Sequence, residues 1–136
     1  MCLDSVRGKL LVKKTRTVYK VVNTFQDKNK NMQIGPLFNY CRQPFVKGLN
    51  IAETVPVKYY PQPRVDSFNY YTSGYHCFIK KEDAELYNAF IYGNEGIVVK
   101  FKIPAGTEVL RGTSDMFASN KKRHLYTLVS PVLIME

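Results

Sequence analysis

The stretch from Gly74 to Pro104 constrains the fold most, because its pattern indicates a strand, a helix, a turn and a second strand in succession. Acidic residues stand at the start of the helix expected over residues 81–92, where the positive end of the helix dipole favours them. Glycine and asparagine over residues 93–96 supply the backbone freedom that ends a helix. Apolar residues then alternate with lysines over residues 97–103, which is the period of a half-buried strand.

The expected helix carries apolar residues at helical spacing, namely Ala84, Tyr87, Phe90 and Ile91. Residues at this spacing lie on one side of a helix and form a single stripe. We therefore expect the stripe to face a sheet, with Phe90 deeply buried.

Further strands follow from β-branched and aromatic content and from turn residues. The sequence predicts a strong strand over residues 17–22, a possible return arm over 32–39, a strand over 49–58 broken at Pro56, a short strand over 107–110, a polar connector over 111–120, and a last strand over 125–135 bent at Pro131. Strands in succession without repeated helical crossovers favour an α+β fold, with a mainly antiparallel sheet and one principal helix at about 81–92. Residues 1–16 are expected to form a basic arm or an edge strand, and residues 17–136 a single globular domain.

Length and cysteine content narrow the class of protein. A chain of 136 residues is of the size of one domain, and no apolar run reaches the roughly 20 residues that a membrane-spanning helix needs. The first residues lack the apolar region of a signal peptide, so we expect a soluble, cytoplasmic protein that does not bind membranes. Three cysteines without a Cys-x-x-Cys spacing predict neither a disulfide framework nor a metal site.

Few residues suggest catalysis. His76 and Cys77 are sequence neighbours, so in a strand they point to opposite faces and cannot act as a pair. A tertiary pairing of Cys77 with His124, or of Cys41 with His76, stays open, although a small core cysteine is the simpler interpretation. No phosphate-binding glycine loop is present. We therefore predict no catalytic residues, no metal and no cofactor, and favour a protein that is not an enzyme.

Charge is the only functional signal that is spread over the whole chain. The net charge of +9 divides into +6 for residues 1–30, zero for residues 31–99 and +3 for residues 100–136. A basic surface attracts phosphate backbones or acidic proteins. The predicted binding residues are two basic runs and one aromatic residue: Lys13, Lys14 and Arg16; Lys121, Lys122 and Arg123; and Tyr126. If the first and last confident strands are neighbours, the two runs merge into one patch.

Three segments together carry a resemblance: residues 18–22, residues 74–84, and residues 97–104 followed by residues 121–123 and an apolar strand. With these segments the chain resembles uncharacterised small domains of phages, mobile elements and large DNA viruses, some of which are attached to pentapeptide-repeat proteins. No such repeat occurs here, so the resemblance covers residues 17–135 alone. It implies a viral or mobile-element setting and no particular chemistry.

A second resemblance concerns the strand and helix that begin at Gly74. They are similar to the strand and helix of ADP-ribosyltransferases, which use NAD. That resemblance implies an early basic residue, a middle aromatic residue and a late catalytic glutamate. Arg16 and Tyr75 match the first two roles, whereas Glu108 follows a proline turn and departs from the family's pattern.

The function favoured by these observations is non-enzymatic binding. We expect a viral or mobile-element protein that docks on nucleic acid, on a nucleic-acid-handling complex or on an acidic protein surface. One alternative is an NAD-using ADP-ribosyltransferase-like enzyme, and another is a structural component of a virion or its assembly. The sequence leaves the oligomeric state open.

Overall fold

The computed structural model describes residues 3–36, 44–53, 56–59 and 69–136. Within these ranges the chain forms one helix, α1 (Lys81–Tyr92), and eleven strands. The strands are β1 (Ser5–Leu11), β2 (Arg16–Gln26), β3 (Met32–Pro36), β4 (Gly48–Ile51), β5 (Pro56–Tyr59), β6 (Asn69–Thr72), β7 (Tyr75–Phe78), β8 (Ile97–Ile103), β9 (Glu108–Ala118), β10 (Lys121–Ser130) and β11 (Val132–Met135).

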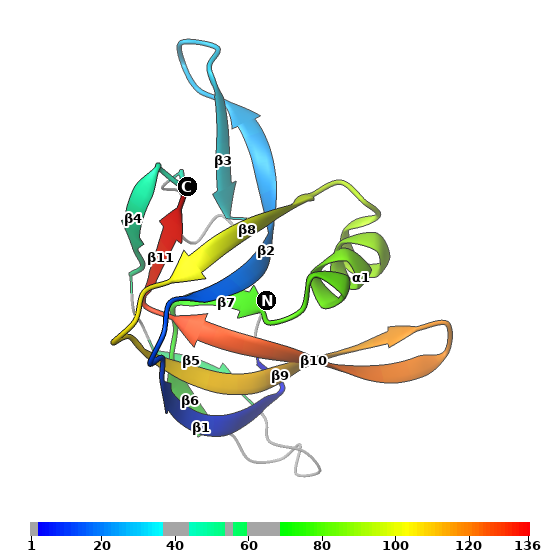
Figure 1. The fold of residues 1–136 in the computed structure, drawn as a ribbon. Helices are drawn as coiled ribbons and strands as arrows, with labels where there is room; N and C mark the ends of the chain where they lie inside the picture. The colour runs from blue at the N-terminus through cyan, green and yellow to red at the C-terminus, as the bar shows by residue number, and fades with distance from the viewer. Residues whose placement is uncertain (1–2, 37–43, 54–55, 60–68) are drawn as a thin grey trace.

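Nine strands form one sheet in the order β1-β9-β10-β7-β2-β8-β11-β4, with β3 paired to β2, and β5 and β6 form a separate hairpin. All the recorded pairings are antiparallel. The expected mainly antiparallel sheet with one helix is therefore confirmed for the described residues. The helix lies against one side of the sheet, and the β2–β3 and β9–β10 hairpins extend beyond the body in different directions (Figure 1).

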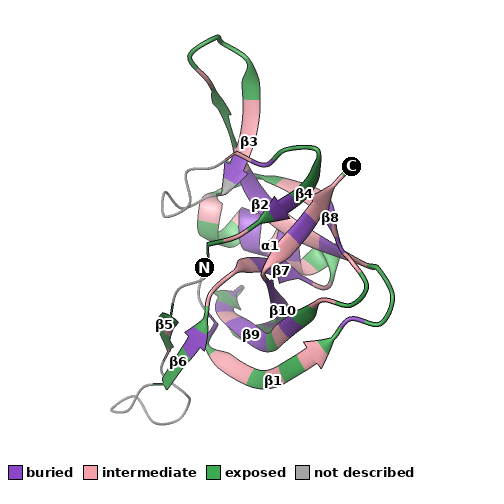
Figure 2. Cartoon of the chain, turned by 90° about the vertical axis from the view of Figure 1, so that its left-hand side faces the viewer, coloured by how far each residue is buried: buried purple, intermediate pink, exposed green. Residues whose placement is uncertain are grey.

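The two faces of the sheet bury different clusters, because successive side chains of a strand point to opposite faces. Val22 and Cys77 belong to one cluster, whereas their neighbours Val21 and Phe78 pack with Ala84 of the helix in another. We call the first face the inner face and the second the helix face. A third cluster lies under the β5–β6 hairpin. Buried residues concentrate in the body, while the hairpin tips are exposed (Figure 2).

The helix begins and ends where the local signals predict. Gly93 takes the left-handed conformation that ends the helix, with a φ of 57°. The predicted apolar stripe of the helix is confirmed for Ala84 and Tyr87, which are buried in the helix-face cluster. It is wrong for Phe90 and Ile91, because Phe90 is 51% exposed and Ile91 is exposed as well. Asn88 takes the buried place instead, since its side-chain amide donates to the carbonyl of Gly96 and accepts from the N–H of the same glycine. These two bonds satisfy a buried polar side chain.

Several other predictions need correction. Residues 111–120 are no polar connector, because residues 108–118 form the long strand β9. Residues 49–58 hold parts of two strands, and Pro56 begins the second of them. The return arm pairs with β2 as far as Pro36, and the rest of its predicted range lies outside the described residues.

One other expectation agrees with the structure. Pro131 separates β10 from β11, as the predicted bend requires. Residues 5–11 form β1, which stands at one end of the nine-stranded order. In the described part of the chain, no helix has the length and apolar character to span a membrane.

Candidate basic binding site

A pocket of about 480 Å³ opens beside β1, β9 and β10. Its lining combines apolar side chains with three arginines and a tyrosine. The lining residues are Arg7, Leu10, Arg16, Ile79, Arg111, Gly112, Tyr126, Thr127 and Leu128. This combination suits a ligand that has both a negative charge and a flat or apolar part.

Strand alternation places most of these walls on the inner face of the sheet. Arg111 is two residues from Val109, and Arg16 is two residues from Val18, and both valines belong to the inner-face cluster. Tyr126 is likewise two residues from Leu128, which belongs to the same cluster. Side chains two apart in a strand share a face, so β2, β9 and β10 each send one polar wall residue toward the same pocket.

Arg7 reaches the pocket through an irregularity in β1. Val6 pairs with Gly112 and Gly8 pairs with Arg111, so Arg7 has no partner across the ladder and forms a β-bulge. Gly8 supports the bulge with a φ of 116°, which side-chain-bearing residues rarely adopt. Val6 and Leu10 consequently pack against different clusters, although four residues separate them. A bulge re-aims a side chain in this way.

Tyr126 is the aromatic element of the site. Its ring is 43% exposed. The guanidinium carbon of Arg7 lies 5.9 Å from the ring centroid and the Lys80 Nζ lies 5.6 Å from it. Both distances are within the range of cation–π attraction. The exposed aromatic ring is therefore surrounded by positive charge.

One carboxylate lies close to this group. Asp83 accepts a hydrogen bond from the backbone N–H of Tyr126 and feels the charges of Lys80 and Arg123. Burial raises the pKa of Asp83, and those three neighbours oppose the increase. Asp83 thus offsets part of the charge of Lys80 at the rim of the site.

The three pocket arginines form no ion pair with any described acidic residue. The acids on the neighbouring strands are occupied elsewhere, because Glu108 pairs with Lys9 at 3.5 Å and Asp115 pairs with His124 at 2.7 Å. Grouped like charges without internal compensation attract an anion from solution.

Two of the predicted binding residues, Arg16 and Tyr126, line this pocket together. Lys13 and Lys14 are exposed in the connection between β1 and β2 and do not line it. Arg7, Lys80 and Arg111 were not predicted as binding residues. A β-bulge and a contact between residues of different strands leave no trace in local sequence patterns.

The second basic run, Lys121 to Arg123, is exposed at the start of β10. The condition for a merged patch is not met, because β7 stands between β2 and β10 in the sheet. The first run follows the end of β1, which pairs with β9 at Glu108, and the second run opens β10, which pairs with β9 at Ala118. These two positions are ten residues apart, which is about 30 Å of strand.

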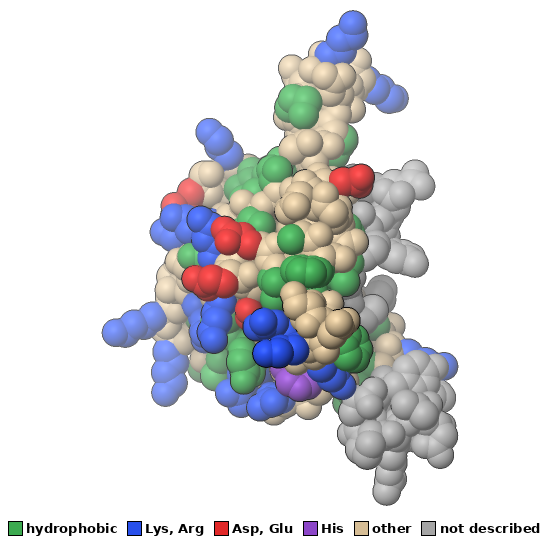
Figure 3. Space-filling view, turned by 90° about the vertical axis from the view of Figure 1, so that its right-hand side faces the viewer, with side chains coloured by type: hydrophobic (Ala, Val, Ile, Leu, Met, Phe, Trp, Pro, Cys, Tyr) green, Lys and Arg blue, Asp and Glu red, His purple; other side chains and the backbone are tan. Residues whose placement is uncertain are grey.

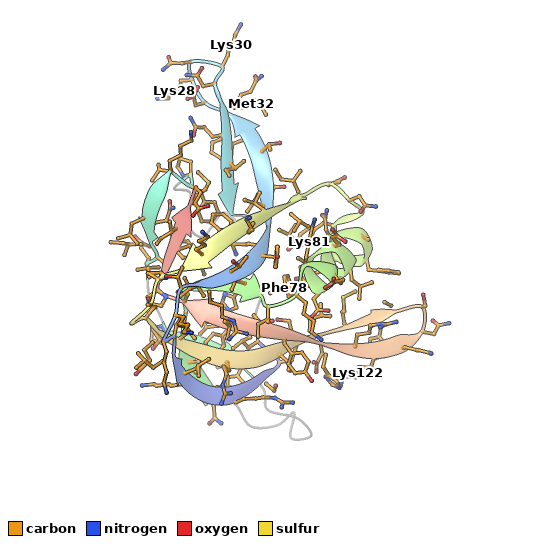
Figure 4. The ribbon with its side chains drawn as sticks, viewed as in Figure 1. Lys28, Lys30, Met32, Phe78, Lys81 and Lys122 are labelled. Atoms are coloured by element: carbon orange, nitrogen blue, oxygen red, sulfur yellow. The ribbon has the colours of Figure 1, made fainter. Side chains whose placement is uncertain are left out.

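Positive charge is therefore distributed over several places on the surface. Lysine and arginine side chains gather in the lower half of Figure 3 and again at the tip of the β2–β3 hairpin, with acidic side chains between them. Figure 4 shows Lys28 and Lys30 at that tip, far from Lys122 on the β9–β10 hairpin.

The geometry does not support chemistry at the histidine and the cysteine of β7. Burial lowers the pKa of His76 to about 3 and raises the pKa of Cys77 to about 12. At neutral pH the imidazole is neutral and the thiol is protonated, so Cys77 is a poor nucleophile. Among the described residues, no three His, Cys, Asp or Glu side chains are placed to hold a metal ion.

The three residues matched to an ADP-ribosyltransferase do not share a pocket in the described structure. Arg16 lines the basic pocket, whose walls include neither Tyr75 nor Glu108. The Tyr75 ring packs on Phe45, with their centroids 5.4 Å apart, and Glu108 is bound to Lys9.

Comparison with models of known families, with curated proteins and with solved structures finds no match for this chain.

Proposed function

We propose that this protein binds single-stranded nucleic acid through the basic pocket and the surface around it. The observation that supports the proposal is the group of Arg7, Arg16 and Arg111 beside the exposed ring of Tyr126. Arginine binds phosphate through its planar set of donors, and exposed aromatic rings stack on the bases of an unpaired strand.

The favoured ligand is an unpaired strand because the aromatic ring has a use only where a base is free to stack. The described part of the chain presents no recognition helix with base-reading side chains, since its single helix faces the sheet through Ala84 and Tyr87. Binding is therefore expected to depend on the phosphate backbone and on stacking, with little dependence on base sequence. An acidic protein partner, in contrast, would use the charges of the arginines but would have no use for the Tyr126 ring.

The test is the affinity for mixed-sequence single-stranded DNA and RNA, measured by fluorescence anisotropy from low to physiological salt. Binding should weaken steeply with salt, since each neutralised phosphate contributes a slope of about −0.7 for single strands. The double change Arg7→Ala/Arg111→Ala should reduce that slope by about 1.4. The double change Lys28→Ala/Lys30→Ala removes the same formal charge at a distant hairpin and is the matched control.

Absence of binding at low salt, or an equal loss in both double variants, would overturn the proposal. Loss of binding in the triple change Lys121→Ala/Lys122→Ala/Arg123→Ala alone would move the interface from the pocket to the β9–β10 hairpin. Equal affinity for an unstructured polyglutamate chain would favour an acidic protein partner. The viral or mobile-element setting stays a prediction.

A further inference from the structure

From the shape of the basic pocket we infer that it holds the terminal nucleotide of a strand and recognises a phosphomonoester at that end. This inference rests on the proposed binding of nucleic acid and adds to it a preference for chemically distinct ends. Three features of the pocket support it: the size of the pocket, the number of its guanidinium groups and the position of the aromatic ring.

The pocket is the size of a small-molecule site. Its volume of about 480 Å³ lies within the range of about 300–1,000 Å³ that such sites occupy. Part of its lining is apolar and comes from Leu10, Ile79 and Leu128, which belong to or pack against the inner-face core cluster. A space of this size and lining suits one nucleotide.

The donors of the pocket exceed what one internal phosphate can use. A phosphodiester carries one negative charge and two unesterified oxygens, whereas a phosphomonoester carries about −1.5 to −2 charges at neutral pH and three such oxygens. Arg7, Arg16 and Arg111 come from three different strands and line the same space. Three guanidinium groups match three acceptor oxygens and the second charge.

The bulge in β1 supports a defined binding geometry. It places the Arg7 guanidinium over the Tyr126 ring, 5.9 Å from its centre, and Arg7 also lines the pocket together with Arg16 and Arg111. A base on Tyr126 and a phosphate among the arginines would be joined by one sugar. Inorganic phosphate alone would use only half of this arrangement.

The experiment compares short single strands of the same sequence with a 5′-phosphate, with a 3′-phosphate and with two hydroxyl ends. A strand that is two nucleotides longer and has hydroxyl ends matches the total charge, because the phosphomonoester adds about two charges. We expect one phosphorylated end to bind at least about tenfold tighter than the charge-matched strand, as an added charge-assisted contact predicts. A nucleoside monophosphate should displace the strand with the preferred phosphorylated end, and the unphosphorylated nucleoside should not.

The conservative variant Arg111→Lys keeps the positive charge but loses the planar donor set. It should reduce the preference for the phosphorylated end to less than about threefold while binding of the hydroxyl-ended strand persists. Equal affinity for all ends in the unmodified protein would overturn the inference and leave the proposed function intact. Absence of binding to every strand at low salt would overturn both.

Discussion

Acid should destabilise this protein through one buried histidine on β7. The N–H of Leu3 donates to the Tyr71 hydroxyl oxygen over 3.1 Å, and that hydroxyl lies 2.9 Å from His76 Nε2. His76 Nδ1 lies 3.2 Å from the carbonyl oxygen of Gly74, which can only accept. The hydrogen of the ring is therefore on Nδ1, and the Tyr71 hydroxyl donates to Nε2. The neutral imidazole satisfies the whole network.

Protonation of this ring is unfavourable in the folded state. Burial, together with the positive charge of Lys20, lowers the pKa of His76 from 6.5 to about 3. The Lys20 Nζ donates to the His76 carbonyl oxygen over 3.0 Å. The unfolded chain takes up a proton below about pH 6.5, whereas the folded chain does so only near pH 3. Stability is therefore lost progressively as the pH falls from about 6.5 toward 3.

The magnitude follows from the difference between the two pKa values. Each pH unit below 6.5 costs about 1.4 kcal/mol, so the free energy of unfolding should fall by about 2 kcal/mol at pH 5 and about 3 kcal/mol at pH 4. A loss of that size is a large fraction of the stability of a typical domain.

The assay is urea unfolding followed by tyrosine fluorescence between pH 7 and pH 5, since the chain has ten tyrosines and no tryptophan. His76→Gln replaces the ring with a side chain that does not titrate, and it should flatten the dependence on pH while lowering stability at pH 7. Leu133→Ala removes a fully buried core side chain and keeps the histidine, so it controls for lower stability itself. Parallel loss of stability in the unmodified protein and in His76→Gln would refute the reasoning.

Three further predictions concern the helix and its surroundings. Phe90→Ala should lower the free energy of unfolding in urea by about 1 kcal/mol or less, because Phe90 is half exposed. Phe78→Ala should lower it by about 3–5 kcal/mol, because Phe78 is only 1% exposed. Equal losses in the two variants would contradict the burial pattern. Asn88→Ala should cost about 2–3 kcal/mol, because it leaves the buried N–H and carbonyl of Gly96 without their partner, and a cost near zero would mean that water replaces the amide. Cys77 should resist alkylation in native buffer at pH 8 and react in urea, because the side chain is buried and burial raises its pKa to about 12. Site-resolved mass spectrometry measures the labelling, and rapid labelling of the native protein would contradict the buried position.

Local sequence signals were sufficient for the central elements of the fold. The helix occupies residues 81–92 as predicted, because acidic residues at its start and Gly93 at its end act within a turn or two of the chain. The strand over residues 97–103 was equally predictable, since alternation is a property of the strand itself. The composition likewise indicates a basic surface.

Tertiary structure decided which face of the helix is buried and which basic residues meet. Asn88 is buried in place of Phe90 because Gly96, eight residues away, brings two backbone groups to its amide. Arg7 and Arg111 line the same pocket as Tyr126 because a bulge shifts the register of β1 and because β9 continues through residues whose sequence predicts a polar connector. A local pattern records the conformation of its own segment, whereas a site made from four strands depends on pairings between strands, among them β1–β9 pairings of residues about 100 positions apart.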